Sequence, residues 1–438
     1  MKDLVVLGGG ISGIGAALLA NKNGFRVFVS DIGSIKDKYL LINNNIEYEE
    51  DGHNYEKIFQ ANIVVKSPGI SESTQIIQDL KNRDILVVSE IEFAYQYTKA
   101  KIIAVTGTNG KTTTTALIGH ILKKAGYDVL VAGNIGTSFS RSICDRDYEY
   151  IVLEISSFQL DDAYLFRPYI SILLNITPDH LERYNYSFES YISSKLKILN
   201  NQNVNDFVIY NYDDPYIRKR ISSEATLIPF SLNHTFNSYG AFYASNKINI
   251  NIKKNNMTIE ELSLQGKHNV YNSMAAAVAG RVLEVKDFII RQSLLDFENI
   301  EHRLEHVLNV HGIEFINDSK ATNINSVWYA LESMTKDVVW IVGGVDKGNN
   351  YNELLDLARE KVKSIICIGE SRRKIHKAFK GDVNNIIEVN TMSEAVFRSY
   401  EIASKGDVVL LSPACASFDM FDNYEHRGIE FKKCVRSL

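Results

Sequence analysis

The chain has 438 residues, of which 45% are hydrophobic and 23% charged, and its formal net charge is −5. This length predicts about three domains at roughly 150 residues each, and the apolar fraction excludes a disordered or fibrous chain. A mildly acidic chain is a poor general nucleic-acid binder, because phosphate binding relies on clustered Lys and Arg, and four cysteines without a CxxC pair indicate reduced thiols in a reducing compartment.

The first third of the chain alternates predicted strands with helices. We expect strands at 3–7, 26–31 and 63–66 and a helix at 11–23, an alternation typical of a parallel sheet covered by helices. The uncharged stretch from Leu4 to Ala20 superficially resembles a signal peptide or a short membrane span. Its cluster of glycines is poor material for an apolar helix, so we expect a soluble protein. The first domain is predicted to comprise residues 1–92.

The middle of the chain begins with the same alternation and then changes. Strands are expected at 101–106, 148–155 and 169–176, around a helix at 112–125. From about 206 to 265, short strands separated by turns predict a small flanking sheet. A helix at 270–283 then returns the chain to this domain, predicted as residues 93–299.

The last third again alternates strands with helices and predicts a third α/β domain, residues 300–438. Its strands are expected at 313–317, 338–342, 364–368, 386–389 and 407–411.

A glycine-rich loop follows the first predicted strand. Gly8 to Gly13 fit the pattern GxGxxG, and Asp31 closes the next strand 18 residues beyond Gly13. Such glycines let the backbone approach a pyrophosphate at a helix N-terminus, and the acid can bind a ribose hydroxyl. The pattern predicts a dinucleotide-type fold but leaves NAD, FAD, other nucleotides and a simple tight turn open.

A second loop, residues 105–113, predicts ATP binding. It ends in Gly110-Lys111-Thr112 after a strand and before a helix, although valine occupies position 105, where a Walker A loop has its first glycine. Backbone N–H groups, the lysine and the hydroxyl suit phosphates and Mg²⁺. Glu154, at the end of the strand 148–155, is a candidate Mg²⁺ ligand beside it.

Other polar residues also follow predicted strands. Residues 318–323, Lys347 and Ser417 come after three strands of the last third, and strand ends of open α/β sheets are where ligands bind. We therefore expect a shared anion-binding face, with unrelated solvated loops as the alternative. His180 and Lys195, considered alone, favour ordinary surface roles.

Taken together, these segments resemble the Mur ligases, ATP-dependent enzymes that add amino acids to the peptidoglycan precursor. The resemblance runs nearly end to end and rests on TGTNGKTT, LEISSFQL, NITPDHLERY, LQGKHNVYN, EHRLE, NDSKATN, and LLSPACASFD with NYEHRG. The NDSKATN segment and the length resemble the branch that adds D-glutamate to UDP-N-acetylmuramoyl-L-alanine. The resemblance implies three α/β domains: Rossmann-like, P-loop ATPase-like with a small flanking sheet, and Rossmann-like.

The resemblance also implies an ADP-forming amide ligase that works through an acyl phosphate. It would be a cytoplasmic monomer in cell-wall synthesis, with small-molecule substrates, no nucleic acid and no membrane insertion. Its cofactors would be ATP and two Mg²⁺ ions, with an N-carboxylated lysine at Lys195. The ATP loop and residues 318–323 lie in different predicted domains, which implies domain closure before chemistry.

Roles for single residues follow from the same resemblance. The catalytic residues would be Lys111, Glu154, His180 and Lys195, with His180 as the candidate base. The metal ligands would be Thr112, Glu154, His180 and Lys195. ATP would be bound by Gly107, Thr108, Asn109, Gly110, Lys111, Thr112, Thr113, Asn269, Asn272, Arg303 and Asp318. The UDP-substrate would contact Ile11, Ser12, Asp31, Gly69 and Asn134, and D-glutamate would contact Lys320, Thr322, Lys347, Ser417 and Tyr424.

One departure and three alternatives stay open. Ile32-Gly33 stands where related ligases often carry polar and basic residues, which leaves the contact to uracil undefined. The alternatives are a folylpolyglutamate-type ligase, a nicotinamide oxidoreductase built on the first glycine-rich loop, and a non-enzymatic P-loop switch.

Overall fold

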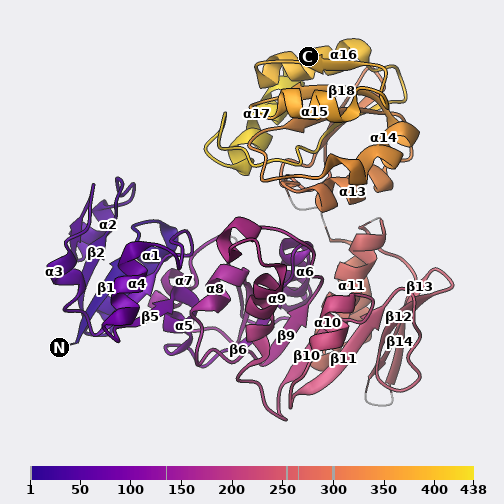
Figure 1. Cartoon of the computed structure of the whole chain (residues 1–438). Coiled ribbons are helices and arrows are strands. Elements are labelled where there is room, and N and C mark those ends of the chain that lie inside the picture. The colour runs from indigo at the N-terminus through magenta and orange to yellow at the C-terminus, as the bar shows by residue number, and fades with distance from the viewer. Residues whose placement is uncertain (1, 135, 253–254, 265, 298–300) are drawn as a thin grey trace. The chain divides into compact units, whose positions relative to one another are not determined.

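The computed structural model describes residues 2–134, 136–252, 255–264, 266–297 and 301–438 (Figure 1). Its contacts divide the chain into two compact units. The first unit comprises residues 1–263 and 269–297, and the second comprises 264–268 and 298–438. The predicted boundary between residues 299 and 300 lies outside the described residues, and the predicted domain limits stay predictions.

The chain opens with an all-parallel five-stranded sheet of order β3-β2-β1-β4-β5. Its strands are β1 (Asp3–Leu7), β2 (Arg26–Ser30), β3 (Glu47–Glu49), β4 (Ile63–Lys66) and β5 (Leu86–Ser89). Its helices are α1 (Ile11–Lys22), α2 (Tyr39–Asn43), α3 (Tyr55–Ile58), α4 (Gln75–Asn82) and α5 (Glu90–Tyr95). The uncharged stretch 4–20 thus forms a strand, a loop and a helix. Among the described residues, no helix has both the length and the apolarity needed to cross a membrane.

A nine-stranded sheet of order β14-β13-β12-β11-β10-β9-β6-β8-β7 completes the first unit. Its parallel strands are β6 (Lys101–Thr106), β7 (Val129–Gly133), β8 (Tyr150–Glu154), β9 (Ile170–Leu173), β10 (Phe207–Asn211), β11 (Thr226–Ser231) and β12 (Gly240–Ala244). The strands β13 (Lys247–Ile252) and β14 (Asn255–Ile259) run antiparallel at the edge. The small sheet expected from the sequence is therefore a continuation of the main sheet, joined to it where β12 pairs with β11 over only two residue pairs.

Helices cover this sheet and connect it with the first one. They are α6 (Lys111–Lys124), α7 (Phe139–Asp145), α8 (Ser157–Asp161), α9 (Phe188–Leu196), α10 (Pro215–Arg220), α11 (Lys267–Val282) and α12 (Asp287–Leu295), with the 3-10 turns η1 (Leu181–Tyr184) and η2 (Lys197–Leu199). One apolar core runs from Leu4 in β1 to Ile217 in α10, so both sheets share it. At the contact of α1 with α7, a Cβ on Gly15 would lie 2.1 Å from the Ser138 hydroxyl oxygen. This close approach requires glycine.

The second unit contains a six-stranded sheet of order β15-β16-β20-β17-β18-β19, in which only β15 runs antiparallel to its neighbour. The strands are β15 (Glu305–Val310), β16 (Ile313–Asn317), β17 (Val338–Gly343), β18 (Val362–Ile368), β19 (Ile386–Glu388) and β20 (Val408–Leu411). The helices are α13 (Ile324–Ser333), α14 (Leu355–Lys361), α15 (Arg372–Phe379), α16 (Met392–Ile402) and α17 (Tyr424–Arg436), with the 3-10 turn η3 (Tyr351–Leu354).

Successive side chains of β17 point to opposite faces of this sheet. Trp340 packs in a core with α13, α14 and α15, whereas Val339 and Ile341 pack with α16 and α17. Alternation of this kind follows from the two-residue period of a strand, and helices on both faces explain why β17 is apolar throughout. The predicted α/β class with mostly parallel sheets is confirmed.

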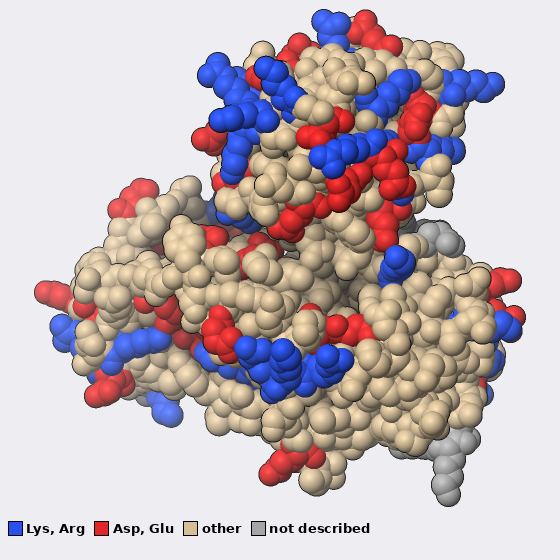
Figure 2. Space-filling model, turned by 45° about the vertical axis from the view of Figure 1, so that its right-hand side comes forward, with Lys and Arg blue, Asp and Glu red and all other residues tan. Residues whose placement is uncertain are grey.

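Charges of both signs are interspersed on the face shown in Figure 2, with wide uncharged areas between them. This distribution agrees with the small net charge of −5.

Candidate active site

The loop between β6 and α6 has the form of a phosphate-binding loop. The Lys111 ammonium donates to the carbonyl oxygens of Gly107 and Thr108, both at 2.8 Å. Gly110 has a φ of 83°, and a Cβ there would lie 2.3 Å from the Asn272 side-chain oxygen, so both the backbone and the space require glycine. A loop of this form at a helix N-terminus presents backbone N–H groups to phosphate oxygens.

The loop is braced by the segment that follows β9. The Asn109 N–H donates to the side-chain oxygen of Asn175 at 2.8 Å, and the Asn175 amide donates back to the Asn109 carbonyl at 3.0 Å. The Thr108 hydroxyl donates to the Thr177 carbonyl at 3.0 Å. These contacts fix the conformation of the loop. Asn175 was not among the predicted site residues, although it lies in the segment NITPDH.

Glu154 is the last residue of β8 and only 2% exposed. Its carboxylate accepts from the Thr112 hydroxyl at 2.7 Å and from the Asn134 side-chain amide at 3.0 Å. Mg²⁺ favours such oxygen ligands and fills the rest of its octahedron with water and phosphate oxygens. Within the described parts of the chain, no group of three or more His, Cys, Asp or Glu side chains could hold a metal ion. Thr112 and Glu154 supply neighbouring oxygen atoms of the kind that such an ion prefers.

Lys195 projects from α9 toward the same loop. It is 2% exposed, donates to the Gly107 carbonyl at 2.9 Å and lies 4.7 Å from the centre of the Tyr191 ring. Burial, reinforced by the charge of Lys111, holds the pKa of Lys195 well below its ordinary value. Only an uncharged amine is nucleophilic toward carbon dioxide, so this site is chemically suited to N-carboxylation.

His180 lies on a neighbouring turn, directly before η1. Its backbone is left-handed, with a φ of 52°. Its ring stands edge-on to the Phe158 ring at 5.2 Å between centres, and its nitrogens lie 3.7 Å from carboxylate oxygens of Asp179 and of Glu182. The structure thus brings Lys111, Glu154 and Lys195 together around the loop between β6 and α6. His180 lies on the turn that follows the bracing segment after β9.

Two of the predicted ATP-binding residues, Asn269 and Asn272, lie in α11. Asn272 donates to Asn269 at 3.2 Å and accepts from the Thr114 hydroxyl at 3.3 Å, and both asparagines are buried. Asn272 also stands against Gly110. These contacts place Asn272 directly behind the phosphate loop.

Of the predicted UDP-substrate residues, Ile11, Ser12, Asp31 and Gly69 come after strands of the first sheet, whereas Asn134 follows β7 of the second. Asp31 accepts from the Gly9 N–H at 2.5 Å and from the Gly33 N–H at 2.8 Å, so it ties two loops together. Gly13 is required because a Cβ there would lie 1.8 Å from the Gly8 carbonyl oxygen. The remaining predicted positions lie at or near the surface: Ile11 (68% exposed), Ser12 and Gly69.

In the second unit, polar residues gather at the ends of β16 and β20. Asp318 is buried, and its carboxyl accepts from the Ser412 hydroxyl at 2.8 Å and from the Leu304 N–H at 3.3 Å. Burial raises the pKa of Asp318 to about 7, against the lowering effects of the Ser412 hydrogen bond and of the nearby Arg303 charge. Asp318 is thus poised between its two protonation states near neutral pH.

The predicted amino-acid-binding residues differ in exposure. The Lys320 ammonium lies 5.1 Å from the centre of the Tyr424 ring. Ser417 is buried, Thr322 half-buried and Lys347 exposed. Lys320 and Tyr424 are therefore neighbours in this structure.

Arg427 is a buried cation that the sequence reasoning did not single out, although it lies in the segment NYEHRG. Its guanidinium donates to the hydroxyl and the carbonyl of Ser319, at 3.0 and 2.8 Å, and to the Cys415 carbonyl at 3.1 Å. Burial lowers its pKa to about 10, which leaves it charged near neutral pH. Arg427 thus fixes the loop after β16 to the loop after β20.

Comparison with known proteins gives the same picture from three directions. Residues 4–76 match the MurD N-terminal domain, 105–280 the Mur ligase middle domain, and 302–415 the Mur ligase glutamate ligase domain. The UDP-N-acetylmuramoylalanine–D-glutamate ligase of Christiangramia forsetii is 49% identical, covering 100% of both chains. The enzyme of the same name from Porphyromonas gingivalis is 47% identical, covering 100% of this chain and 99% of its own.

Solved structures share the fold at lower identity. The UDP-N-acetylmuramate-alanine ligase MurC of Thermotoga maritima matches with a TM-score of 0.64 at 20% identity, covering 100% of this chain and 99% of that one. The MurF ligase of the same organism, solved in complex with ADP, matches with a TM-score of 0.62 at 17% identity, covering 96% and 99%.

Proposed function

The chain belongs to the Mur ligase family, and on that premise we propose that it joins D-glutamate to UDP-N-acetylmuramoyl-L-alanine while ATP is cleaved to ADP and phosphate. The observation that carries the proposal is the identity of 43–49% with relatives named for this activity, over 99–100% of the chain. It supports a role of the protein in peptidoglycan precursor synthesis. We assign the protein to the cytoplasm and propose that it is a monomer.

The chemistry requires that a poor leaving group be converted into a good one. An oxygen of the L-alanine carboxylate attacks the γ-phosphorus of ATP, which forms an acyl phosphate and releases ADP. The D-glutamate amine then attacks the acyl carbon, and a tetrahedral intermediate forms. Its carbon–oxygen bond breaks, the amide remains, and phosphate departs with the former carboxylate oxygen.

The residues of the first unit would supply charge and position for the first step. Lys111 would offset the charge of the transferred phosphoryl group, which is the main demand of such a transition state. The attacking amine must lose a proton, and His180 is our candidate base. Gly107 to Thr113, Asn269 and Asn272 would hold ATP, and Ile11, Ser12, Asp31, Gly69 and Asn134 the UDP-substrate.

Two Mg²⁺ ions would be held by Thr112, Glu154, His180 and an N-carboxylated Lys195. When bound, they neutralise charge on phosphoryl oxygens. The burial of Lys195 and the lowered pKa of its amine support the carboxylation.

From the second unit, Arg303 and Asp318 would bind the nucleotide, and Lys320, Thr322, Lys347, Ser417 and Tyr424 would bind D-glutamate. The neighbouring Lys320 and Tyr424 support this assignment, because an ammonium and a phenol can together bind an amino-acid carboxylate.

The proposal is tested by product analysis. The purified protein, with ATP, Mg²⁺, UDP-N-acetylmuramoyl-L-alanine and D-glutamate, should form the ligated product detected by mass spectrometry, with one ADP per amide. When the alanine carboxylate carries oxygen-18, one labelled oxygen should appear in the released phosphate. Product formation with unlabelled phosphate would exclude the acyl phosphate, and absence of the product would refute the proposed function.

A further inference from the structure

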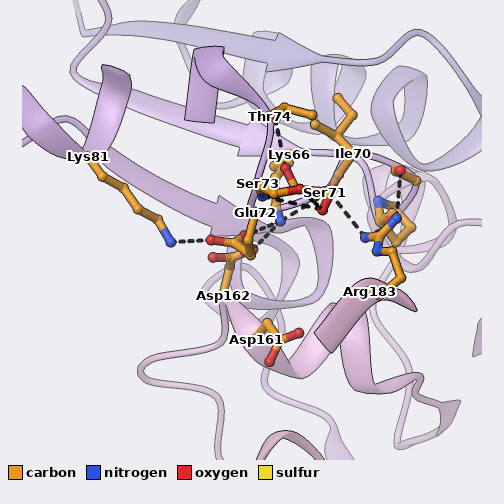
Figure 3. Close-up of polar contacts among 12 residues, drawn as sticks. Lys66, Ile70, Ser71, Glu72, Ser73, Thr74, Lys81, Asp161, Asp162 and Arg183 are labelled. Atoms are coloured by element: carbon orange, nitrogen blue, oxygen red, sulfur yellow. Dashed lines mark hydrogen bonds and ion pairs between the residues drawn. The ribbon is translucent and has the colours of Figure 1, made fainter. Parts of the chain in front are cut away.

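The loop after β4, residues 67–74, is held from two sides (Figure 3). It contains Gly69, an exposed residue that we propose to contact the UDP-substrate. On the side of its own domain, the buried Lys66 ammonium donates to the Ile70 carbonyl at 3.3 Å and pairs with the Glu72 carboxylate. The loop is therefore anchored at its base by the strand from which it emerges.

On the other side, the loop is held by an arginine of the central domain. Arg183 in η1 donates to three consecutive carbonyl oxygens, those of Pro68 at 2.9 Å, Gly69 at 2.8 Å and Ile70 at 3.2 Å. A planar guanidinium with several donors is suited to collect such a set, whereas an ammonium is a single point charge. The positive charge of the guanidinium also offsets the partial negative charge of these carbonyl oxygens, which would reduce their repulsion of an anionic diphosphate bound at the loop.

The Arg183 guanidinium packs on an aromatic ring that also contacts the His180 turn. Its guanidinium carbon lies 4.4 Å from the centre of the Phe158 ring. The His180 ring stands edge-on to that ring at 5.2 Å, and the Tyr184 ring stacks on it at 6.0 Å. The Phe158 ring therefore contacts both Arg183, which binds the loop, and His180 of the candidate active site.

We propose that Arg183 is a positioning residue that couples the substrate loop 67–70 to the His180 turn. By holding the loop and the turn in one arrangement, it sets the nucleotide-sugar in place relative to the groups at the phosphate loop. This inference rests on the proposed function, because it takes loop 67–70 as part of the UDP-substrate site.

Contacts that do not involve Arg183 already hold the two domains of the first unit together. The buried Lys66 and Asp162 form an ion pair of 2.8 Å across the domain boundary, and the apolar core is continuous. The hydroxyl of Ser138 and the N–H of Ser140 both donate to the buried Glu90. Loss of the half-buried Arg183 should therefore change substrate binding much more than folding.

The test compares Arg183→Ala, Arg183→Lys and the control Arg218→Ala in the full-length protein. Arg218 also stacks on a ring, that of Tyr212 at 5.1 Å, but it lies in α10 away from this loop. We expect Arg183→Ala to raise the KM for UDP-N-acetylmuramoyl-L-alanine by about tenfold or more, as loss of charged hydrogen bonds implies. The KM values for ATP and D-glutamate and the melting temperature should match those of the control, and Arg183→Lys should recover part of the loss.

An unchanged KM for the nucleotide-sugar in Arg183→Ala would overturn the inference. So would a parallel rise of all three KM values with a lower melting temperature, because that pattern belongs to a structural role. Calorimetric binding of UDP-N-acetylmuramoyl-L-alanine separates this result from failure of the proposed function. If the wild-type protein bound the nucleotide-sugar but formed no ligated product, the proposed function would be refuted and the role of Arg183 would not. If wild type and Arg183→Ala bound the nucleotide-sugar with equal affinity, the role of Arg183 would be refuted.

Discussion

Asp318 makes the stability of the second unit depend on pH in a direction opposite to that of most carboxyl groups. Its ordinary pKa of 3.8 is raised to about 7 by burial. Between these values the folded protein keeps a proton that the unfolded chain releases, so stability falls as pH rises. At about 1.4 kcal/mol per unit, the whole interval corresponds to about 4 kcal/mol, which is lost in full above pH 7.

Asp318→Asn removes this dependence with little change of shape. The asparagine oxygen can accept from the Leu304 N–H, and its amide can donate to the Ser412 hydroxyl, which turns to accept. We therefore expect the variant to gain stability relative to wild type as pH rises. Between pH 5 and pH 8, the difference in unfolding free energy should shift by roughly 3 kcal/mol in favour of the variant.

Tryptophan fluorescence during urea unfolding reports this unit selectively, because both tryptophans of the chain, Trp328 and Trp340, belong to it. The control is Asp356→Asn, whose carboxylate is 98% exposed and should give a difference that does not change with pH. If the difference between Asp318→Asn and wild type were also constant from pH 5 to pH 8, Asp318 would not be held protonated by burial, and the reasoning would be refuted.

Three other substitutions test the site and the fold. Lys111→Ala should lower phosphate release by about a hundredfold or more, with an unchanged circular dichroism spectrum, because it removes charge at the phosphates; turnover near wild type would contradict the assignment. Lys195→Ala should lose turnover and regain part of it with formate or acetate, and no recovery at any concentration would count against the carbamate. Gly343→Ala should destabilise the second unit by roughly 3 kcal/mol, because φ is 132° and the new Cβ would lie 1.9 Å from the Ile368 carbonyl oxygen. Equal urea midpoints for Gly343→Ala and Gly381→Ala, whose Cβ meets no atom within 4 Å, would contradict this.

Local patterns were sufficient to predict much of the fold. The strands β1, β4, β6 and β16 have the bounds expected from their apolar runs. The edge strands β3, β5, β7 and β15 were missed. The strand β3 (Glu47–Glu49) has only three residues and no apolar run, whereas β5 and β7 are short apolar runs that were not recognised as strands. The single sheet of the central domain was also missed, since the pairing of β11 with β12 depends on residues that no periodicity identifies.

The candidate site was predictable in its local part only. The phosphate loop can be recognised from the sequence because its glycine, lysine and threonine stand at fixed spacing. The lowered pKa of Lys195, by contrast, arises from burial, reinforced by the charge of Lys111, a residue that lies more than 80 positions earlier in the chain and meets Lys195 only in the folded protein. The same holds for Arg183, whose partners in loop 67–70 belong to another domain. A resemblance to a family could supply a role for Lys195, but only the fold shows the physical reason for it.

The central claim is that this chain selects D-glutamate as the amine to be joined to UDP-N-acetylmuramoyl-L-alanine. The most direct test measures phosphate release with the authentic nucleotide substrate, ATP and Mg²⁺ against a panel of D-glutamate, L-glutamate, L-alanine and a diamino acid. The account predicts release that depends on both the nucleotide substrate and D-glutamate and stays at background with the other amino acids. Release that is indifferent to the amino acid, or that prefers another member of the panel, would contradict it.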